Sequence, residues 1–413
     1  MKSRFLAVFA GLPREIWLLA GAAFINFLGY MALPFLILYL TGTVGYSIES
    51  AGTLLAVYGV GGVAGAWFGG HLCDRIGSGY TLLASFVGSA ALLCLLPYLL
   101  SVFVVASVCL FVLSFFQGSF RPAYDSCVVT VCPADERSRA YSLYVAAINI
   151  GAAVGTASGG IAFSIKPELV FWLNGVASLA ASVWVFLIVL PALTNGEQRA
   201  RNANESGTND IASGAGKVPW RDTIFLTLCA GVFIVETIGR QPTSTLPLYM
   251  TQHYGLSSEE FGRMLTLGHI LFALLMLPIA SWTKKYEPRI VASVGVLVIA
   301  CGYGALPFGT SALSAVFLYI VILSGQLLFY PSVVSIVMEA AASSKGRSGS
   351  YMGAYRSTQS VAAITAPAIG TFAYSAFSPN VLWYGCGATG VAVAVFFSIE
   401  HIRTRKTDSD SSI

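Results

Sequence analysis

Charged side chains interrupt the long apolar stretches of this chain, and the spacing of five of them suggests chemistry. Glu236 and Arg240 are separated by one helical turn, as are Arg121 and Asp125, so each pair would share one face of a helix. Arg356 stands in a third apolar stretch. An ion in apolar surroundings is costly, so such groups usually face an interior cavity and have a function.

Glu236 has the environment best suited to carrying a proton. Burial disfavours its charged form and Arg240 favours it, so its protonation depends on water access and on substrate occupancy. Two interpretations stay open for this pair, a proton carrier and a static ion pair that holds its helix. Asp125 is the second carrier candidate, but its position near the cytoplasmic boundary also favours a gate role with Arg121 or Arg75.

Polar and aromatic side chains at matching depth complete a candidate substrate site. Arg356 is suited to bind an anionic group or to pair with a carboxylate of the other half of the chain. For each polar residue taken alone, hydrogen bonding between helices is the competing interpretation. The substrate-binding candidates are Asn26, Tyr30, Arg121, Asn149, Arg240, Gln326, Arg356 and Gln359.

The elements that must position these residues are membrane-spanning helices. The chain is 56% hydrophobic and 10% charged, whereas soluble domains carry about 25% charged residues. Its apolar runs have the length of about 20 residues that a helix needs to cross a bilayer, and they lack the alternation of barrel strands. We therefore expect an all-α polytopic membrane protein with twelve transmembrane helices at 16–41, 51–70, 79–99, 102–124, 140–163, 168–192, 222–250, 259–282, 289–309, 312–338, 350–374 and 378–399.

The positions of Lys and Arg predict the orientation of these spans. Of the 23 Lys and Arg residues, only Lys166 faces one side of the membrane and 18 face the other, while four lie inside spans: Arg121, Arg240, Arg263 and Arg356. Because cytoplasmic loops carry the excess of positive charge, both termini are expected in the cytoplasm, in a multi-pass protein of the cell (inner) membrane. The net charge of +4 reflects this bias, so we infer no nucleic-acid partner.

A polar segment divides the spans into two groups of six. The segment at 194–219 is rich in Asn, Ser, Gly and charge, as flexible linkers are. We predict a six-helix bundle at 1–193, a cytoplasmic linker at 194–219, and a second six-helix bundle at 220–413 that ends in a short cytoplasmic tail. Such pseudo-symmetric bundles place a site at the midplane between the halves. One constant offset relates four residues of the first half to four of the second: Arg137, Tyr141, Asn149 and Gly160, and Arg347, Tyr351, Gln359 and Gly370.

Within the seventh span, Gly239, Pro242 and Pro247 are expected to break the helix and give it the flexibility of a gating element.

Other function classes lack the residues that they need. The Gly216-Lys217 pair is followed by Val218, so it does not form a phosphate-binding loop, and no hydrolase, metalloprotease or dinucleotide motif is found. The Cys and His residues are scattered. We expect no enzyme, no cofactor and no metal.

A short motif follows the second predicted span: Gly70-His-Leu-Cys-Asp74-Arg75-Ile-Gly77. It resembles the G-x-x-x-D-[R/K]-x-G signature of the major facilitator superfamily, which lies at the same place between spans two and three. The resemblance implies that Gly70, Asp74, Arg75 and Gly77 form a gate element. A carboxylate at this place can cap a neighbouring helix N-terminus.

Further segments resemble the twelve-span drug:proton antiporters of that superfamily. The resemblance implies a secondary transporter that exports amphipathic drugs or metabolites in exchange for protons. Proton-coupled uptake of a small nutrient is the alternative, and a non-transporting membrane receptor or channel is a third class. The expected partners are a small-molecule substrate, protons and the lipid bilayer, and the expected functional unit is a monomer. The segments are Gly118-Ser-Phe-Arg121-Pro122-Ala with Pro133-Ala-Asp-Glu-Arg137-Ser-Arg139-Ala-Tyr, Gly151-x-x-x-Gly155-Thr156-x-x-Gly159-Gly160, and Arg347-Ser-Gly-Ser-Tyr351-Met-Gly353 through Arg356.

Overall fold

The computed structural model describes residues 9, 11–133, 135–193, 222–342 and 348–410, and it places the side chains in these ranges except at 342, 348, 349 and 400–410. Within these ranges every regular element is a helix. The predicted linker at 194–219 lies outside the described residues, so the boundaries at 193 and 220 stay a prediction.

Contacts between residues divide the chain into two units. Unit 1 contains residues 1–209 and 257–273, and unit 2 contains residues 210–256 and 274–413. Helix α12 (Ser258–Thr283) therefore contributes its first part to unit 1 and its second part to unit 2.

Unit 1 holds the first six predicted spans, and its helices extend beyond the apolar runs by a few residues. Helix α4, for example, begins after Ser47, whose hydroxyl accepts from the Ser50 amide at 3.2 Å, and it ends before Gly77, which adopts a φ of 90°. A positive φ favours glycine and stops a helix. The elements are α2 (Arg14–Leu28), α3 (Ala32–Leu38), η1 (Tyr39–Thr43), α4 (Ile48–Ile76), α5 (Ser78–Leu99), α6 (Phe103–Val131), α7 (Arg137–Ile165), α8 (Leu169–Trp184) and η2 (Val185–Val189).

Unit 2 holds the remaining predicted spans, with the second part of α12. Asp222 starts its first helix by accepting from the Phe225 amide at 3.1 Å and from the Tyr351 hydroxyl at 2.9 Å. The elements are α10 (Thr223–Gly239), η4 (Gln241–Thr243), α11 (Thr245–Gln252), α13 (Pro288–Ala305), η5 (Leu306–Phe308), α14 (Ala312–Ala342), α15 (Ser348–Ala376) and α16 (Pro379–Asp410).

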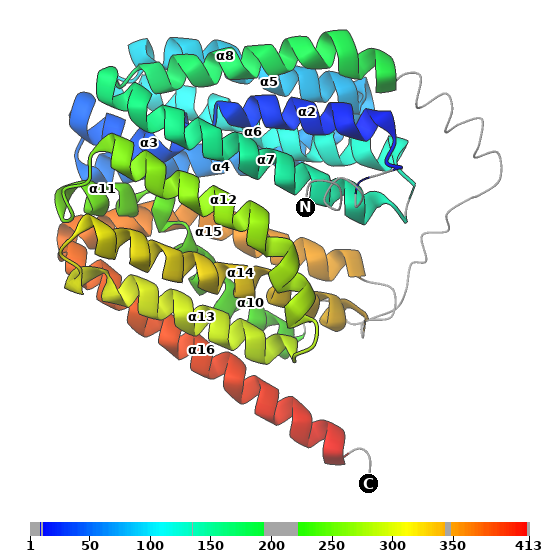
Figure 1. Ribbon diagram of the computed structural model, residues 1–413, viewed down its shortest axis with the longest axis vertical. Helices are drawn as coiled ribbons and strands as arrows, with labels where there is room; N and C mark the ends of the chain where they lie inside the picture. Colours follow the sequence, from blue (N-terminus) through cyan, green and yellow to red (C-terminus); the bar gives the residue numbers. More distant parts are fainter. Residues whose placement is uncertain (1–8, 10, 134, 194–221, 343–347, 411–413) are drawn as a thin grey trace. The chain divides into compact units, whose positions relative to one another are not determined.

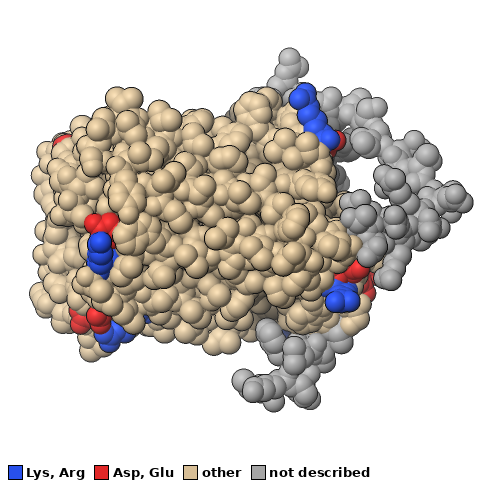
Figure 2. All heavy atoms as spheres, turned by 90° about the horizontal axis from the view of Figure 1, so that it is seen from above, with Lys and Arg blue, Asp and Glu red and all other residues tan. Residues whose placement is uncertain are grey.

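The helices have the length and the surface of membrane spans. Eleven of the described helical segments are long and apolar enough to cross a bilayer. The remaining predicted span, at 350–374, is also helical, as α15, but it is more polar because it carries Arg356, Gln359 and several Ser and Thr residues. On the face drawn in Figure 2, charged side chains gather near the two ends and a broad uncharged zone separates them. The chain is thus a multi-pass, all-α membrane protein.

Corresponding helix pairs pack in both units (Figure 1). Helix α2 packs on α7 in unit 1 and α10 packs on α15 in unit 2, which are the first and fifth predicted spans of each half. Likewise α5 packs on α6 and α8, while α13 packs on α14 and α16. This correspondence agrees with the internal repeat in the sequence.

Glycines allow some of these helices to approach closely. A Cβ atom added at Gly65 of α4 would lie 2.0 Å from the carbonyl oxygen of Phe115 in α6. One added at Gly155 of α7 would lie 2.8 Å from the carbonyl oxygen of Leu28 in α2. Both distances are shorter than van der Waals contact, so a larger residue would push the helices apart.

The first and seventh spans are both interrupted. Helix α2 ends at Leu28 and α3 begins at Ala32, whereas α10 ends at Gly239 and α11 begins at Thr245. The break after Gly239 contains Pro242, as predicted from the sequence. Gln241, which is 1% exposed, bridges this break by donating to the Thr237 carbonyl at 2.9 Å and accepting from the Thr245 hydroxyl at 2.6 Å. Its amide supplies hydrogen bonds where the helical pattern is interrupted, as an apolar medium requires.

Candidate functional site

The C-terminal end of α10 places a buried carboxylate beside the break in the seventh span. Glu236 lies one turn before the end of this helix, and it is only 3% exposed. Val232 and Val235 of the same helix are also buried. A carboxylate at such a position must find its partners among protein side chains.

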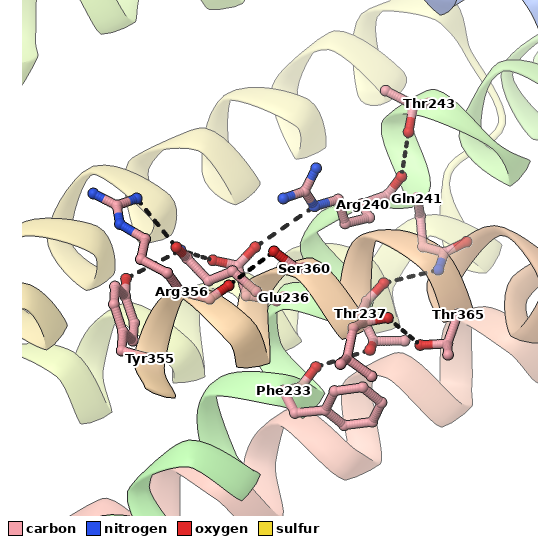
Figure 3. A network of polar contacts seen from close by, with 12 residues as sticks. Phe233, Glu236, Thr237, Arg240, Gln241, Thr243, Tyr355, Arg356, Ser360 and Thr365 are labelled. Atoms are coloured by element: carbon pink, nitrogen blue, oxygen red, sulfur yellow. Dashed lines mark hydrogen bonds and ion pairs between the residues drawn. The ribbon is translucent and has the colours of Figure 1, made fainter. Parts of the chain in front are cut away.

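Two side chains supply these partners (Figure 3). Gln359 of α15 donates from its Nε2 atom to Glu236 Oε1 at 2.7 Å. On the other carboxylate oxygen, the Nε atom of Arg240 lies 3.7 Å from Glu236 Oε2. Glu236 therefore has one short hydrogen bond and one longer ion pair, and the side chain of Arg240 is 42% exposed.

The amide of Gln359 connects this carboxylate to a second arginine. Arg356 donates from Nη1 to Gln359 Oε1 at 3.3 Å, and its guanidinium carbon lies 5.9 Å from the ring centre of Tyr355. The Nε2 atom of Gln359 also lies 3.1 Å from the Tyr355 hydroxyl. In Figure 3 the guanidinium groups of Arg356 and Arg240 lie on either side of Glu236. The positive charge exceeds the negative charge within this cluster.

Helix α14 adds polar groups on the side of Gly239. A Cβ atom added at Gly239 would lie 3.4 Å from the Tyr330 hydroxyl and 3.7 Å from Gln326 Nε2. Gln326 is 8% exposed, and within the described part of the chain its amide has no hydrogen-bond partner. The glycine therefore leaves room beside an amide that is free to bind another group.

In unit 1 the predicted pair in the fourth span is more exposed. Arg121 Nε lies 3.2 Å from Asp125 Oδ2, and the two side chains are 52% and 37% exposed. The guanidinium of Arg121 also lies over the ring of Tyr144, with its carbon 5.3 Å from the ring centre.

The other unit 1 candidates fall into two groups. Asn26 and Tyr30 line a cavity inside this unit. Asn149 of α7 instead bonds the Val145 carbonyl at 2.9 Å, and its Oδ1 atom lies 3.4 Å from His269 Nδ1 of α12. The ring of His269 meets that of Tyr30 edge-on at 5.9 Å.

The predicted gate motif forms the junction of two helices. Gly70, Asp74 and Arg75 lie on the last turns of α4, and Gly77 separates it from α5. The side chains of Asp74 and Arg75 are exposed, and among the described residues neither forms an ion pair.

Several polar residues of these clusters were not predicted. Tyr58 hydrogen-bonds Gln117 inside unit 1, and Tyr330 and Tyr355 adjoin the Glu236 cluster. Each interrupts an apolar span, so the criterion that selected Asn26 could have selected them as well. His269, which lies beside Asn149 and Tyr30, was not among the predicted site residues either. Within the described residues, no three His, Cys, Asp or Glu side chains are placed to hold a metal ion.

Comparison with known sequences adds independent information. The family model of the Major Facilitator Superfamily matches residues 19–364 and, in a second match, residues 242–412. The chain is 25% identical over 354 residues to the uncharacterized MFS-type transporter YqjV of Bacillus subtilis (strain 168), covering 83% of this chain and 82% of that protein. It is 24% identical over 328 residues to the class D tetracycline resistance protein of Salmonella ordonez, covering 78% and 79%.

Comparison with solved structures supports the fold. A POT family transporter in complex with 5-aminolevulinic acid superposes with a TM-score of 0.76. The alignment covers 95% of this chain and 96% of that chain, at 16% sequence identity. This likeness concerns the arrangement of the helices alone.

Proposed function

Since this chain belongs to the Major Facilitator Superfamily and is a secondary transporter, we propose that it exports amphipathic drugs or metabolites in exchange for protons. The observation that carries this proposal is the environment of Glu236. A carboxylate that is 3% exposed, beside a broken helix, is suited to bind a proton and release it when water reaches it. The tetracycline resistance relative supports a drug-like substrate.

The partners of Glu236 suggest how a proton and a substrate compete. A donor group of the substrate near the charged carboxylate replaces part of the stabilisation that Arg240 supplies. A proton at the same carboxylate removes the charge that the donor group needs. Binding of one therefore opposes binding of the other, which is the condition for exchange.

The surplus of positive charge favours substrates that also carry an acceptor or a negative group. Arg356 and the exposed side chain of Arg240 supply donors on either side of Glu236. A zwitterion or a polar amphipathic compound satisfies both signs of charge, and the free amide of Gln326 supplies a neutral hydrogen bond.

The same geometry supports the alternative of proton-coupled uptake. Protonation of Glu236 weakens its ion pair with Arg240, which is already long at 3.7 Å. An anionic substrate then binds the released guanidinium, so proton and substrate bind together. The two mechanisms differ in the direction of flux relative to the proton gradient.

The experiment is transport into proteoliposomes under imposed pH gradients of either sign. The substrate is tetracycline, together with the amphipathic zwitterion that most raises the unfolding temperature of the purified chain. We expect accumulation inside vesicles whose lumen is acidic. Accumulation inside vesicles whose lumen is alkaline would instead establish uptake.

Glu236→Gln is expected to abolish gradient-driven accumulation while downhill flux without a gradient continues, because the amide binds no proton. Glu259→Gln is the matched control, since Glu259 lies in an exposed pair with Arg263 at 3.3 Å. Gradient-driven accumulation that survives in Glu236→Gln would rule out Glu236 as the proton carrier.

A further inference from the structure

Unit 1 contains a cavity of its own, separate from the cluster around Glu236. The cavity has a volume of about 190 Å³ and lies among α2, α3, α4, α5, α6 and α8. Rings of Phe27, Phe86 and Phe120 line it, with centres 6.3 Å apart for Phe27 and Phe120 and 5.4 Å apart for Phe86 and Phe120. Among the described residues that line it, none carries a charge.

Two buried polar side chains in the wall have no partner. Ser89 of α5 is 3% exposed and Asn174 of α8 is 7% exposed, and both line the cavity. In the part of the chain that the structure describes, neither side chain makes a hydrogen bond. Nearby Ser85 differs, because its hydroxyl donates to the Leu82 carbonyl at 2.8 Å.

An unpartnered buried polar group carries a cost that a bound group can remove. Leaving a buried donor or acceptor unsatisfied is unfavourable, and a serine within a helix can usually bond a carbonyl of the preceding turn. Ser89 and Asn174 instead keep their polar atoms available to the cavity, between walls of aromatic rings.

From this arrangement we propose that the cavity is a binding site for the uncharged, ring-bearing part of a small molecule. A cavity of about 150 Å³ in another protein accepts benzene, so this one accommodates a ring with a single polar substituent. The ring packs against Phe27, Phe86 and Phe120, and a hydroxyl or amide substituent meets Ser89 and Asn174. A charged group is excluded, because the described lining offers it no counter-charge.

This proposal does not depend on the proton-coupling proposal. The cavity residues lie in unit 1, whereas Glu236 lies in unit 2, and binding of a small molecule in the cavity can be measured without a pH gradient. The probe is 4-bromophenol, which is uncharged at pH 6, added to the full-length chain in detergent. We expect a saturable rise in unfolding temperature, with bromobenzene giving a smaller rise because it lacks the hydroxyl. Crystals soaked with the phenol should show the bromine anomalous signal among α2, α5 and α8.

Variants separate specific binding from partition into detergent. Ser89→Ala and Asn174→Leu should each weaken the affinity for 4-bromophenol by about two- to tenfold, the loss of one neutral hydrogen bond. Ser89→Leu fills the cavity and should abolish binding. Ser293→Ala is the matched control, since Ser293 is 6% exposed and donates to the Arg289 carbonyl at 2.8 Å in unit 2.

The proposal is overturned if Ser89→Ala, Asn174→Leu and Ser89→Leu all bind the phenol as the wild type does, or if bromobenzene binds equally well. A bromine signal found only outside this cavity would overturn it as well. Ser89→Ala removes only one hydroxyl and is expected to fold. The proposal can therefore be tested with Ser89→Ala even if Ser89→Leu does not fold.

Discussion

Exposure distinguishes the two acidic residues that were predicted as proton carriers. The side chain of Glu236 is 3% exposed, whereas that of Asp125 is 37% exposed and pairs with an arginine that is itself 52% exposed. A carboxylate that is almost fully buried depends on its protein partners more than one that is partly exposed. Asp125 is therefore better suited to a gate contact that forms and breaks, and Glu236 to a proton that is bound and released.

The hydrogen bond from Gln359 is the shortest contact that Glu236 makes, so its loss should be measurable. Gln359→Leu removes the donor at 2.7 Å and leaves one carboxylate oxygen without it. We expect a loss of about 1 to 3 kcal/mol in the free energy of unfolding, the cost of an unsatisfied buried acceptor. Denaturant titration of the purified chain in detergent measures this loss.

Gln252→Leu is the control for that experiment. Gln252 accepts from the Tyr374 hydroxyl at 2.8 Å, but it is exposed, so its loss should cost much less. Equal losses in the free energy of unfolding for the two substitutions would mean that the hydrogen bond to Glu236 stabilises the protein no more than the exposed one.

At the scale of the helices, glycine and proline set where backbones approach and where they break. The first and seventh spans are interrupted at corresponding places, and both lie against the helix that carries Asn149 or Gln359. A span that is already broken can change its angle without losing more of its backbone hydrogen bonds. The interruption after Gly239 therefore places Glu236 and Arg240 beside a flexible joint.

The close packing of α4 on α6 gives a prediction with an internal control. Gly65→Ala places a Cβ atom 2.0 Å from the Phe115 carbonyl oxygen, so the helices must separate. We expect a loss of about 1 to 3 kcal/mol in stability, as for other overpacked sites. Gly70→Ala lies in the same helix with no heavy atom within 4 Å of the added Cβ, and it should stabilise by up to about 1 kcal/mol.

The unfolding temperatures of Gly65→Ala and Gly70→Ala, measured together with that of the wild type, test this prediction. If Gly65→Ala unfolds at the wild-type temperature, α4 and α6 do not pack as closely as described.

At the scale of the whole chain, the distribution of Lys and Arg predicts which loops face the cytoplasm. In a variant without its native cysteines, Lys166→Cys and Ser311→Cys should react with a membrane-impermeant maleimide in intact cells. Lys284→Cys should react only after permeabilisation, because the positive-inside rule places it in the cytoplasm. Labelling of Lys166→Cys and Lys284→Cys from the same side would contradict twelve spans with cytoplasmic ends.

The sequence alone was enough to predict most of the fold. Lipid requires every span to bond its own backbone, so apolar length predicts helices with little dependence on their neighbours. The break in the seventh span could be predicted from Gly239 and Pro242, because proline interrupts a helix whatever its neighbours are. The polar residues of α15 were visible in the sequence too. Comparison of the described helices adds that α15 is less apolar than the eleven other spans.

The sequence by itself determined the set of membrane helices and the ions within them. The free-energy cost of placing a polar residue in lipid depends mainly on the type of that residue, so it can be estimated without the tertiary structure. Only the tertiary structure decided which of those groups meet. Gln359 reaches Glu236 across 123 positions of sequence, and Asn26 faces a cavity with Asn174, because helix rotation and packing set these contacts. Rotation depends on how whole surfaces fit together, which no local pattern of residues contains.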